Sequence, residues 1–171
     1  MLSSCGDYVA GDSLGLAYRV MILNGCRRAE LCGFRWAGAD LEVPYRDPET
    51  GEERMGAVLT VARTLVQLGG KVHEEATAKT RAGDRLVFLD DQPWANGEPG
   101  TASLLREHKA AQEMEKMLAG DAWADNDLVF CKPDGRPWMP DHVSKKSSGW
   151  RCGRACPWSS CTRAAGIPAS R

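Results

Sequence analysis

The feature that most constrains the fold is a β-rich block from Ala57 to Leu89, which interrupts an otherwise helical chain. Apolar residues alternate in "AVLTVARTLVQL", and Gly69-Gly70 then provides a turn into a second strand, "KVHEEATAK". Residues 80–84 turn again at Gly83 and lead into "RLVFL". Short alternating segments separated by glycine turns are typical of antiparallel neighbours. The block therefore predicts a small three-stranded antiparallel meander.

A helix–turn–helix pattern precedes this block. Apolar residues recur at helical spacing from Ser13, the pair Asn24-Gly25 breaks the pattern, and a second short helix follows up to Trp36. The positions expected to face inward are Leu14, Ala17, Val20, Met21 and Leu23 in the first helix, and Leu31 and Phe34 in the second.

Two more helices are expected after the block. Residues 101–118 form a strong amphipathic pattern that Gly120 ends, and Pro140 with Asp141 opens a further helix. The inward positions of the long helix are Leu104, Leu105, His108, Ala111 and Met114. Residues 40–56 and 90–100 are expected to be loops. The predicted fold is α+β, a mainly helical core with a small three-stranded antiparallel β-sheet.

Composition narrows the class of protein. The chain has 171 residues and a net charge of −1, so electrostatic attraction to nucleic acid must come from local basic patches. No apolar run is long enough for a membrane span and no signal peptide is evident, which favours a cytoplasmic protein without a membrane partner. Without a secretory signal, the seven cysteines are expected to be free thiols. Cys152, Cys156 and Cys161 lack the paired spacing of zinc ribbons, so no metal site is expected.

Three motifs, in order, resemble the catalytic domain of the tyrosine recombinases, the phage-integrase family. The first is "GCRRAELCGFRW", in which Gly25, Arg27, Glu30 and Leu31 match the family's G-x-R-x-x-E-L signature. The second is "AKTRAGDRLVFL", which places the family's hairpin lysine at Lys79. The third, weaker match is "DLVFCKPDGRPWMPDHVSKK". The resemblance covers residues 14–146 and divides the chain into a stub at 1–12, a partial catalytic domain at 13–147 and an irregular tail at 148–171.

The resemblance implies cleavage of double-stranded DNA by a tyrosine hydroxyl, giving a 3′-phosphotyrosine, with no metal or nucleotide cofactor. It also implies assembly with other integrase protomers, as a tetramer on DNA. Arg27 would bind the reacting phosphate, because a guanidinium donates two hydrogen bonds and stays charged. Lys79 would protonate the leaving oxygen. Glu30 would support Arg27 or cap the helix.

Three further arginines are candidates for contacts with the DNA backbone. Arg28 is expected to be a solvated neighbour of Arg27 or a phosphate contact. For Arg81 and Arg85, in or beside the hairpin turn, phosphate contact and a solvated surface position are equally open.

Two parts of the family's machinery are missing. None of His73, His108 and His142 begins an H-x-x-R box, and the three tyrosines, at positions 8, 18 and 45, all precede the place where the family carries its nucleophile. His108 and Tyr18 are expected to be packing residues, and His142 a capping or surface residue. The domain is therefore expected to be unable to cleave DNA by itself. The alternatives are a non-catalytic DNA-binding or interfering fragment of a mobile-element integrase, and an unrelated α+β interaction protein or small thiol/metal module.

The composition of the tail suggests a cause for the missing motifs. If residues 154–162, "RACPWSSCT", and the following Arg163 are written in G/C-rich codons and translated from the last base of the first codon, the result begins Gly-Leu-Pro-Val-Val-Lys-Leu-His-Glu. The next shifted codons can encode Gly-Arg, which completes an H-x-x-R box. The protein sequence largely fixes two bases of each shifted codon. We hypothesise a frameshifted, truncated integrase gene.

Overall fold

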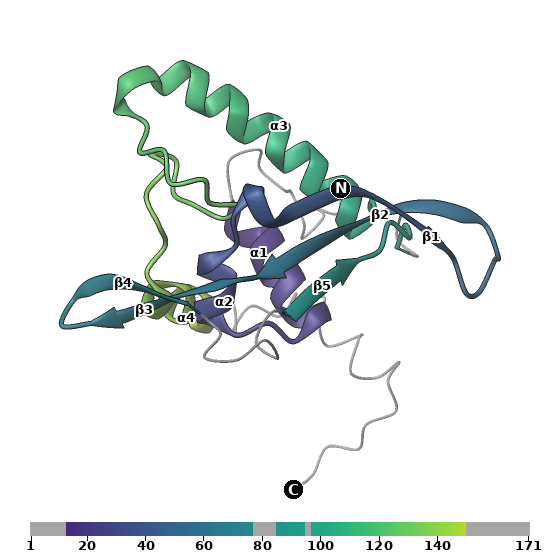
Figure 1. Ribbon diagram of the computed structural model, residues 1–171, viewed down its shortest axis with the longest axis horizontal. Coiled ribbons are helices and arrows are strands. Elements are labelled where there is room, and N and C mark those ends of the chain that lie inside the picture. Colours follow the sequence, from purple (N-terminus) through teal and green to yellow (C-terminus); the bar gives the residue numbers. More distant parts are fainter. Residues whose placement is uncertain (1–12, 77–84, 95–96, 150–171) are drawn as a thin grey trace, which may run out of the picture.

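The computed structural model describes residues 13–76, 85–94 and 97–149 (Figure 1). The helices are α1 (Ser13–Asn24), α2 (Arg28–Gly33), α3 (Thr101–Ala119) and α4 (Pro140–Gly149), with short 3₁₀ turns η1 (Trp36–Gly38) and η3 (Gly120–Ala122). The strands are β1 (Ala39–Arg46), β2 (Glu53–Val61), β3 (Arg63–Leu68), β4 (Lys71–Ala76) and β5 (Arg85–Leu89). The α+β class is confirmed, as are the helix–turn–helix, the long helix that ends at Gly120 and the helix opened by Pro140.

The strands do not form the expected meander. Two antiparallel sheets are present among the described residues, one in the order β1-β2-β5 and one made of β3 and β4 (Figure 1). The run "AVLTVARTLVQL" is divided at Ala62, so its first half pairs with β5 and its second half with β4. Leu59 lies opposite Val87 in the first sheet, and Val66 opposite His73 in the second. Periodicity located these strands, but pairing depends on contacts that a local pattern does not encode.

The expectation of a loop at residues 40–56 was wrong. β1 occupies most of its first half, and residues 53–56 begin β2. Side chains in β1 alternate along the strand, with Leu41, Val43 and Tyr45 half-buried and the residues between them exposed. β1 is an edge strand, so one side of its backbone has no neighbouring strand. Pro44, which lacks an N–H group, and the charged residues are tolerated there because that side is open to water.

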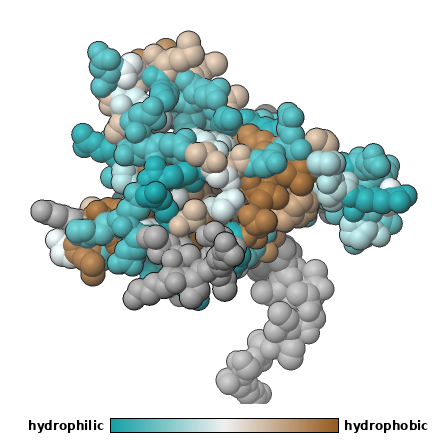
Figure 2. Space-filling view, viewed as in Figure 1, coloured by the Kyte–Doolittle hydropathy of each residue, from teal (hydrophilic) through white to brown (hydrophobic). Residues whose placement is uncertain are grey.

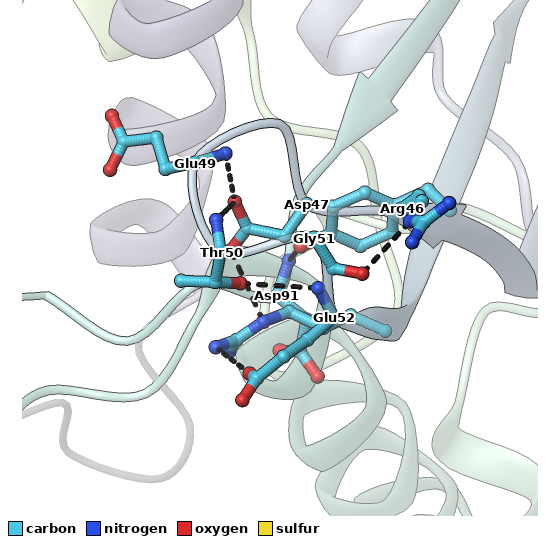
Figure 3. Close-up of polar contacts among 9 residues, drawn as sticks. Arg46, Asp47, Glu49, Thr50, Gly51, Glu52 and Asp91 are labelled. Carbon is cyan, nitrogen blue, oxygen red and sulfur yellow. Dashed lines mark hydrogen bonds and ion pairs between the residues drawn. The ribbon is translucent and has the colours of Figure 1, made fainter.

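A buried carboxylate organises the turn between β1 and β2 (Figure 3). Asp47 Oδ1 accepts hydrogen bonds from the amides of Glu49, at 2.8 Å, and Thr50, at 3.3 Å. Its Oδ2 lies 3.3 Å from Arg54 Nε. The Glu49 amide chiefly, with Thr50 and the Arg54 charge, lowers the pKa of Asp47. The charged Asp47 carboxylate therefore stabilises the turn of the β1–β2 hairpin, which projects from the body.

The core lies between α1, α2 and α3 and the inner faces of the sheets. Its largest fully buried side chains are Phe34, Phe130, Leu14, Leu16, Leu31, Leu59, Leu89, Leu105, Val20, Val61, Val129 and Val143. Two residues expected to face inward are exposed instead, Leu23 at 48% and Met114 at 64%. Leu23 lies in the last turn of α1, and Met114 lies in the C-terminal half of α3.

Polar side chains of α3 anchor the buried segment at residues 128–131. His108 is buried, and its Nε2 lies 2.7 Å from the Val129 carbonyl oxygen. Its ring also stacks on Phe130, with ring centroids 5.9 Å apart. Burial lowers the pKa of His108, although the contact with Val129 acts in the opposite direction. His108 is therefore a packing residue, as predicted, and so is Tyr18, whose hydroxyl donates to the Val143 carbonyl at 2.6 Å.

Candidate nucleic-acid interface

The turn between α1 and α2 sets the direction of the first motif. Gly25 has a φ of +62°, in the left-handed region that glycine adopts without a steric penalty. The Cys26 amide then donates to the Met21 carbonyl at 3.1 Å, which closes the end of α1. The chain leaves this turn extended at Arg27, the N-cap residue of α2. Arg27 therefore stands where two helices meet, with an exposed side chain.

Glu30 is the buried acid of this motif. Its Oε2 accepts a hydrogen bond from the backbone amide of Arg27 at 2.9 Å, the carboxylate half of a capping box. The contact with Arg27 is thus to its amide, which leaves the guanidinium directed to solvent. A carboxylate at this position also interacts favourably with the first turn of the helix.

Arg85, at the start of β5, also contacts the Glu30 carboxylate. Its Nη2 lies 3.4 Å from Glu30 Oε2 and 3.5 Å from Cys26 Sγ, while 46% of its side chain remains exposed. Burial raises the pKa of the Cys26 thiol, which is therefore protonated at neutral pH. Glu30 thus links the start of α2 to the start of β5 and holds Arg85 beside the turn that carries Arg27.

Arg28 connects α2 to the last described helix. Its Nη1 donates to the hydroxyl of Ser144 in α4, and the Arg28 side chain is exposed. Three of the predicted arginines, Arg27, Arg28 and Arg85, therefore lie around the N-terminal end of α2. Lys79 and Arg81, the remaining sequence candidates, lie outside the described residues.

This arrangement is suited to binding a phosphodiester. Three arginines and one buried carboxylate leave a net positive surface, and guanidinium groups donate to phosphate oxygens with paired N–H groups. The described tyrosines have other contacts: Tyr18 donates to Val143, and the Tyr45 hydroxyl accepts from the Asp91 amide at 3.0 Å. Both phenols thus serve contacts within the fold.

Within residues 13–76, 85–94 and 97–149, no three His, Cys, Asp or Glu side chains are grouped so as to hold a metal ion. The helices in these ranges are also too short or too polar to cross a bilayer.

Besides the pairing of Arg85 with Glu30, two arrangements around α2 were not predicted. Ser144 as the partner of Arg28 had no sequence signal, because 116 positions separate the two residues. Arg35 and Arg63 converge on Glu74 in β4. The sequence provided little indication of that cluster, because Glu74 lies in a strand that pairs regularly with β3.

Comparison with known proteins gives one match. A curated protein named Integrase, from Saccharopolyspora erythraea, is 38% identical to this chain over 72 residues. This stretch of the chain is integrase-like. The aligned residues make up 42% of the chain but only 14% of that integrase, so the chain spans a small part of its relative. No family model and no solved structure matches the chain.

Proposed function

We propose that the chain is an incomplete catalytic domain of a tyrosine recombinase, which binds double-stranded DNA in site-specific integration and does not cleave it unaided. The observation that carries the proposal is the clustering of Arg27, Arg28 and Arg85 around the Glu30-capped start of α2. The integrase-like stretch supports the same conclusion.

The proposed roles follow from the chemistry of each side chain. Arg27 binds the scissile phosphate, and removal of such a donor from a complete site costs on the order of 10²–10³ in rate. Glu30 positions α2 and Arg85, while Arg28 and Arg85 bind neighbouring backbone phosphates, with Arg81 as a further candidate. Lys79 is the proposed general acid. The chemistry needs no metal or nucleotide, and oligomers on DNA would follow the family's pattern.

Two parts of the family's catalytic machinery do not occur in this sequence. The residues three positions after the histidines are Ala76, Ala111 and Lys145, so none of them completes an H-x-x-R box. After Tyr45 the chain contains no tyrosine. A second phosphate-binding arginine and the nucleophile are therefore lacking, and the proposed function is binding without strand cleavage.

Two assays on the purified chain test this proposal. In a gel shift with duplex DNA, the expected result is binding that weakens steeply with salt, because phosphate contacts release counterions. With a nicked suicide substrate for covalent trapping, the expected result is no protein–DNA adduct. Salt-independent or absent binding contradicts the DNA-binding part, and a covalent adduct contradicts the inactivity.

The frameshift hypothesis has its own test, which is the nucleotide sequence around codons 154–171. The expected result is an adjacent frame that encodes an H-x-x-R box followed by a tyrosine. A neighbouring frame with neither feature overturns the hypothesis and leaves the DNA-binding proposal in place.

A second candidate, an interfering fragment that docks on intact recombinase, is favoured by the open face of the larger sheet. Leu86 and Phe88 of β5 are 66% and 42% exposed. Figure 2 shows apolar surface over this sheet. An outer sheet face in contact with water usually carries polar residues. If the fragment interferes by docking, adding it to an intact recombinase lowers recombination, and Leu86→Glu relieves that inhibition. Unchanged recombination, or inhibition that survives Leu86→Glu, contradicts this candidate.

A further inference from the structure

Two arginines from separate segments converge on one carboxylate oxygen, away from the start of α2. Glu74 Oε1 lies 2.9 Å from Arg35 Nη2 and 2.8 Å from Arg63 Nη1. Arg35 follows α2, Arg63 begins β3, and Glu74 lies in the middle of β4. Arg35 Nη1 also donates to the Asn126 carbonyl at 2.8 Å. The cluster thus joins the β3–β4 hairpin to the body and carries one net positive charge.

The geometry leaves much of the arginines' hydrogen-bonding capacity unused by Glu74. Each guanidinium uses one nitrogen on the same oxygen, whereas an arginine fork is best matched by two oxygens of one anion. A phosphate group has enough oxygens to give each arginine its own acceptor. The side chains of Arg35, Arg63 and Glu74 are 32%, 56% and 32% exposed, so an anion in solution has access to the cluster.

We propose that Arg35 and Arg63 form a phosphate-binding pair, separate from Arg27, and that Glu74 occupies it as a built-in competitor. Partial burial alone would raise the pKa of Glu74, but hydrogen bonds from Arg63 and Arg35 outweigh it and lower that pKa. The carboxylate is therefore ionised at neutral pH and competes as an anion. Exposed ion pairs are weak because water and salt screen them, so a phosphate group can displace it.

A purely structural role makes a different prediction. If Glu74 serves only to fasten the hairpin, its neutralisation lowers stability and leaves phosphate affinity unchanged. If Glu74 is a competitor, neutralisation raises phosphate affinity through Arg35 and Arg63. Affinity and stability therefore separate the two roles.

The chain supplies a matched control in the next residue. Glu75 carries the same charge in the same strand, but successive side chains of a strand point to opposite faces. Glu74→Gln and Glu75→Gln thus make an identical change in net charge on opposite faces of the hairpin. Arg63→Gln removes the more exposed arginine and leaves the contact between Arg35 and Asn126 intact.

The experiment follows arginine side-chain NMR signals of the full chain during titration with inorganic phosphate. Glu74→Gln is expected to bind phosphate about three- to tenfold more tightly than the unsubstituted chain. Glu75→Gln is expected to match the unsubstituted chain, and Arg63→Gln to abolish the gain in the Glu74→Gln background. Equal affinities for Glu74→Gln and Glu75→Gln, or a gain that survives Arg63→Gln, overturn the proposal.

A second arm identifies the source of the phosphate. Titration with a short DNA duplex is expected to shift the same Arg35 and Arg63 signals, which assigns the pair to nucleic-acid backbone. Shifts with inorganic phosphate only assign it to free phosphate. The phosphate arm contains no DNA, so a failure of DNA binding and a failure of this inference are distinguishable. Thermal unfolding of each variant identifies any signal change that comes from a loss of folding, and a melted Glu74→Gln variant contradicts the competitor role.

Discussion

At the scale of single residues, Glu30 matters most to the proposed interface. Its carboxylate accepts a hydrogen bond from the amide of Arg27 and pairs with Arg85. One side chain therefore connects the start of α2 with the start of β5. The sequence motif indicated Arg27 and Glu30 because their spacing is local. It did not indicate Arg85 as a partner of Glu30, since 55 positions separate them.

Glu30→Ala is expected to lower the free energy of unfolding by about 1–2 kcal/mol, because it removes a helix-capping acceptor together with the partner of Arg85. Glu30→Gln keeps an acceptor and is expected to cost less. Urea unfolding gives both values, with Glu107→Ala on the exposed face of α3 as a control that changes stability little. A cost for Glu30→Ala no larger than that of the control contradicts the bridging role.

At the scale of elements, α2 and β3 approach so closely that only glycine fits between them. A Cβ on Gly33 would lie 2.3 Å from the carbonyl oxygen of Arg63. Gly15 in α1, in contrast, has no atom of another described element within 4 Å of its Cβ position. This contact holds the β3–β4 hairpin, and with it Arg63 and Glu74, against the helix that carries Arg28.

Gly33→Ala is expected to destabilise the fold by about 1–3 kcal/mol, because backbone atoms must move to admit the methyl group. Gly15→Ala, the matched control, is expected to raise stability by up to about 1 kcal/mol, since alanine favours a helix over glycine. Differential scanning calorimetry of the two variants measures this contrast. The same effect of both substitutions on stability would contradict the close packing of α2 on β3.

The anchoring of α3 on residues 128–131 makes stability depend on pH. Burial lowers the pKa of His108 below its ordinary value of 6.5, so protons bind the unfolded chain more readily than the folded one. Its stabilising contribution is complete above about pH 6.5 and is lost as the pH falls through the folded-state pKa, by at most about 1.4 kcal/mol per pH unit.

Chemical unfolding at several pH values tests this dependence. His108→Gln is expected to remove most of the slope between neutral and mildly acidic pH, because the amide does not titrate. His142→Gln, at an exposed histidine, is expected to retain it. A slope that persists in His108→Gln means that another group titrates.

At the scale of the whole molecule, the sequence predicted the kinds and positions of most elements but not how they pair. Helix α1 is apolar along most of its length and ends at Asn24, before Gly25, whereas α3 is amphipathic and ends at Gly120, so their limits followed from local rules. β1 was missed because its exposed half is charged and contains Pro44, which by composition resembles a loop. The division of residues 57–68 between two sheets depends on the packing of β3 against α2, which is a tertiary contact.

The same division holds for the candidate interface. Arg27 and Glu30 followed from a seven-residue motif, whereas the contact of Arg28 with Ser144 and the convergence of Arg35 and Arg63 on Glu74 depend on the folded chain. Long-range charge pairs leave no local trace, because either partner resembles an ordinary surface residue.

The proposed function depends on binding of DNA phosphates by the arginines at the start of α2. Its most direct test is the salt dependence of binding to duplex DNA, compared between Arg27→Ala and Arg136→Ala. Arg136 is an arginine with a side chain 71% exposed, in the loop before α4. Arg27→Ala is expected to weaken binding and to reduce the slope of log K against log salt by about one, while Arg136→Ala leaves both nearly unchanged. Equal affinities and slopes for the two variants would contradict it.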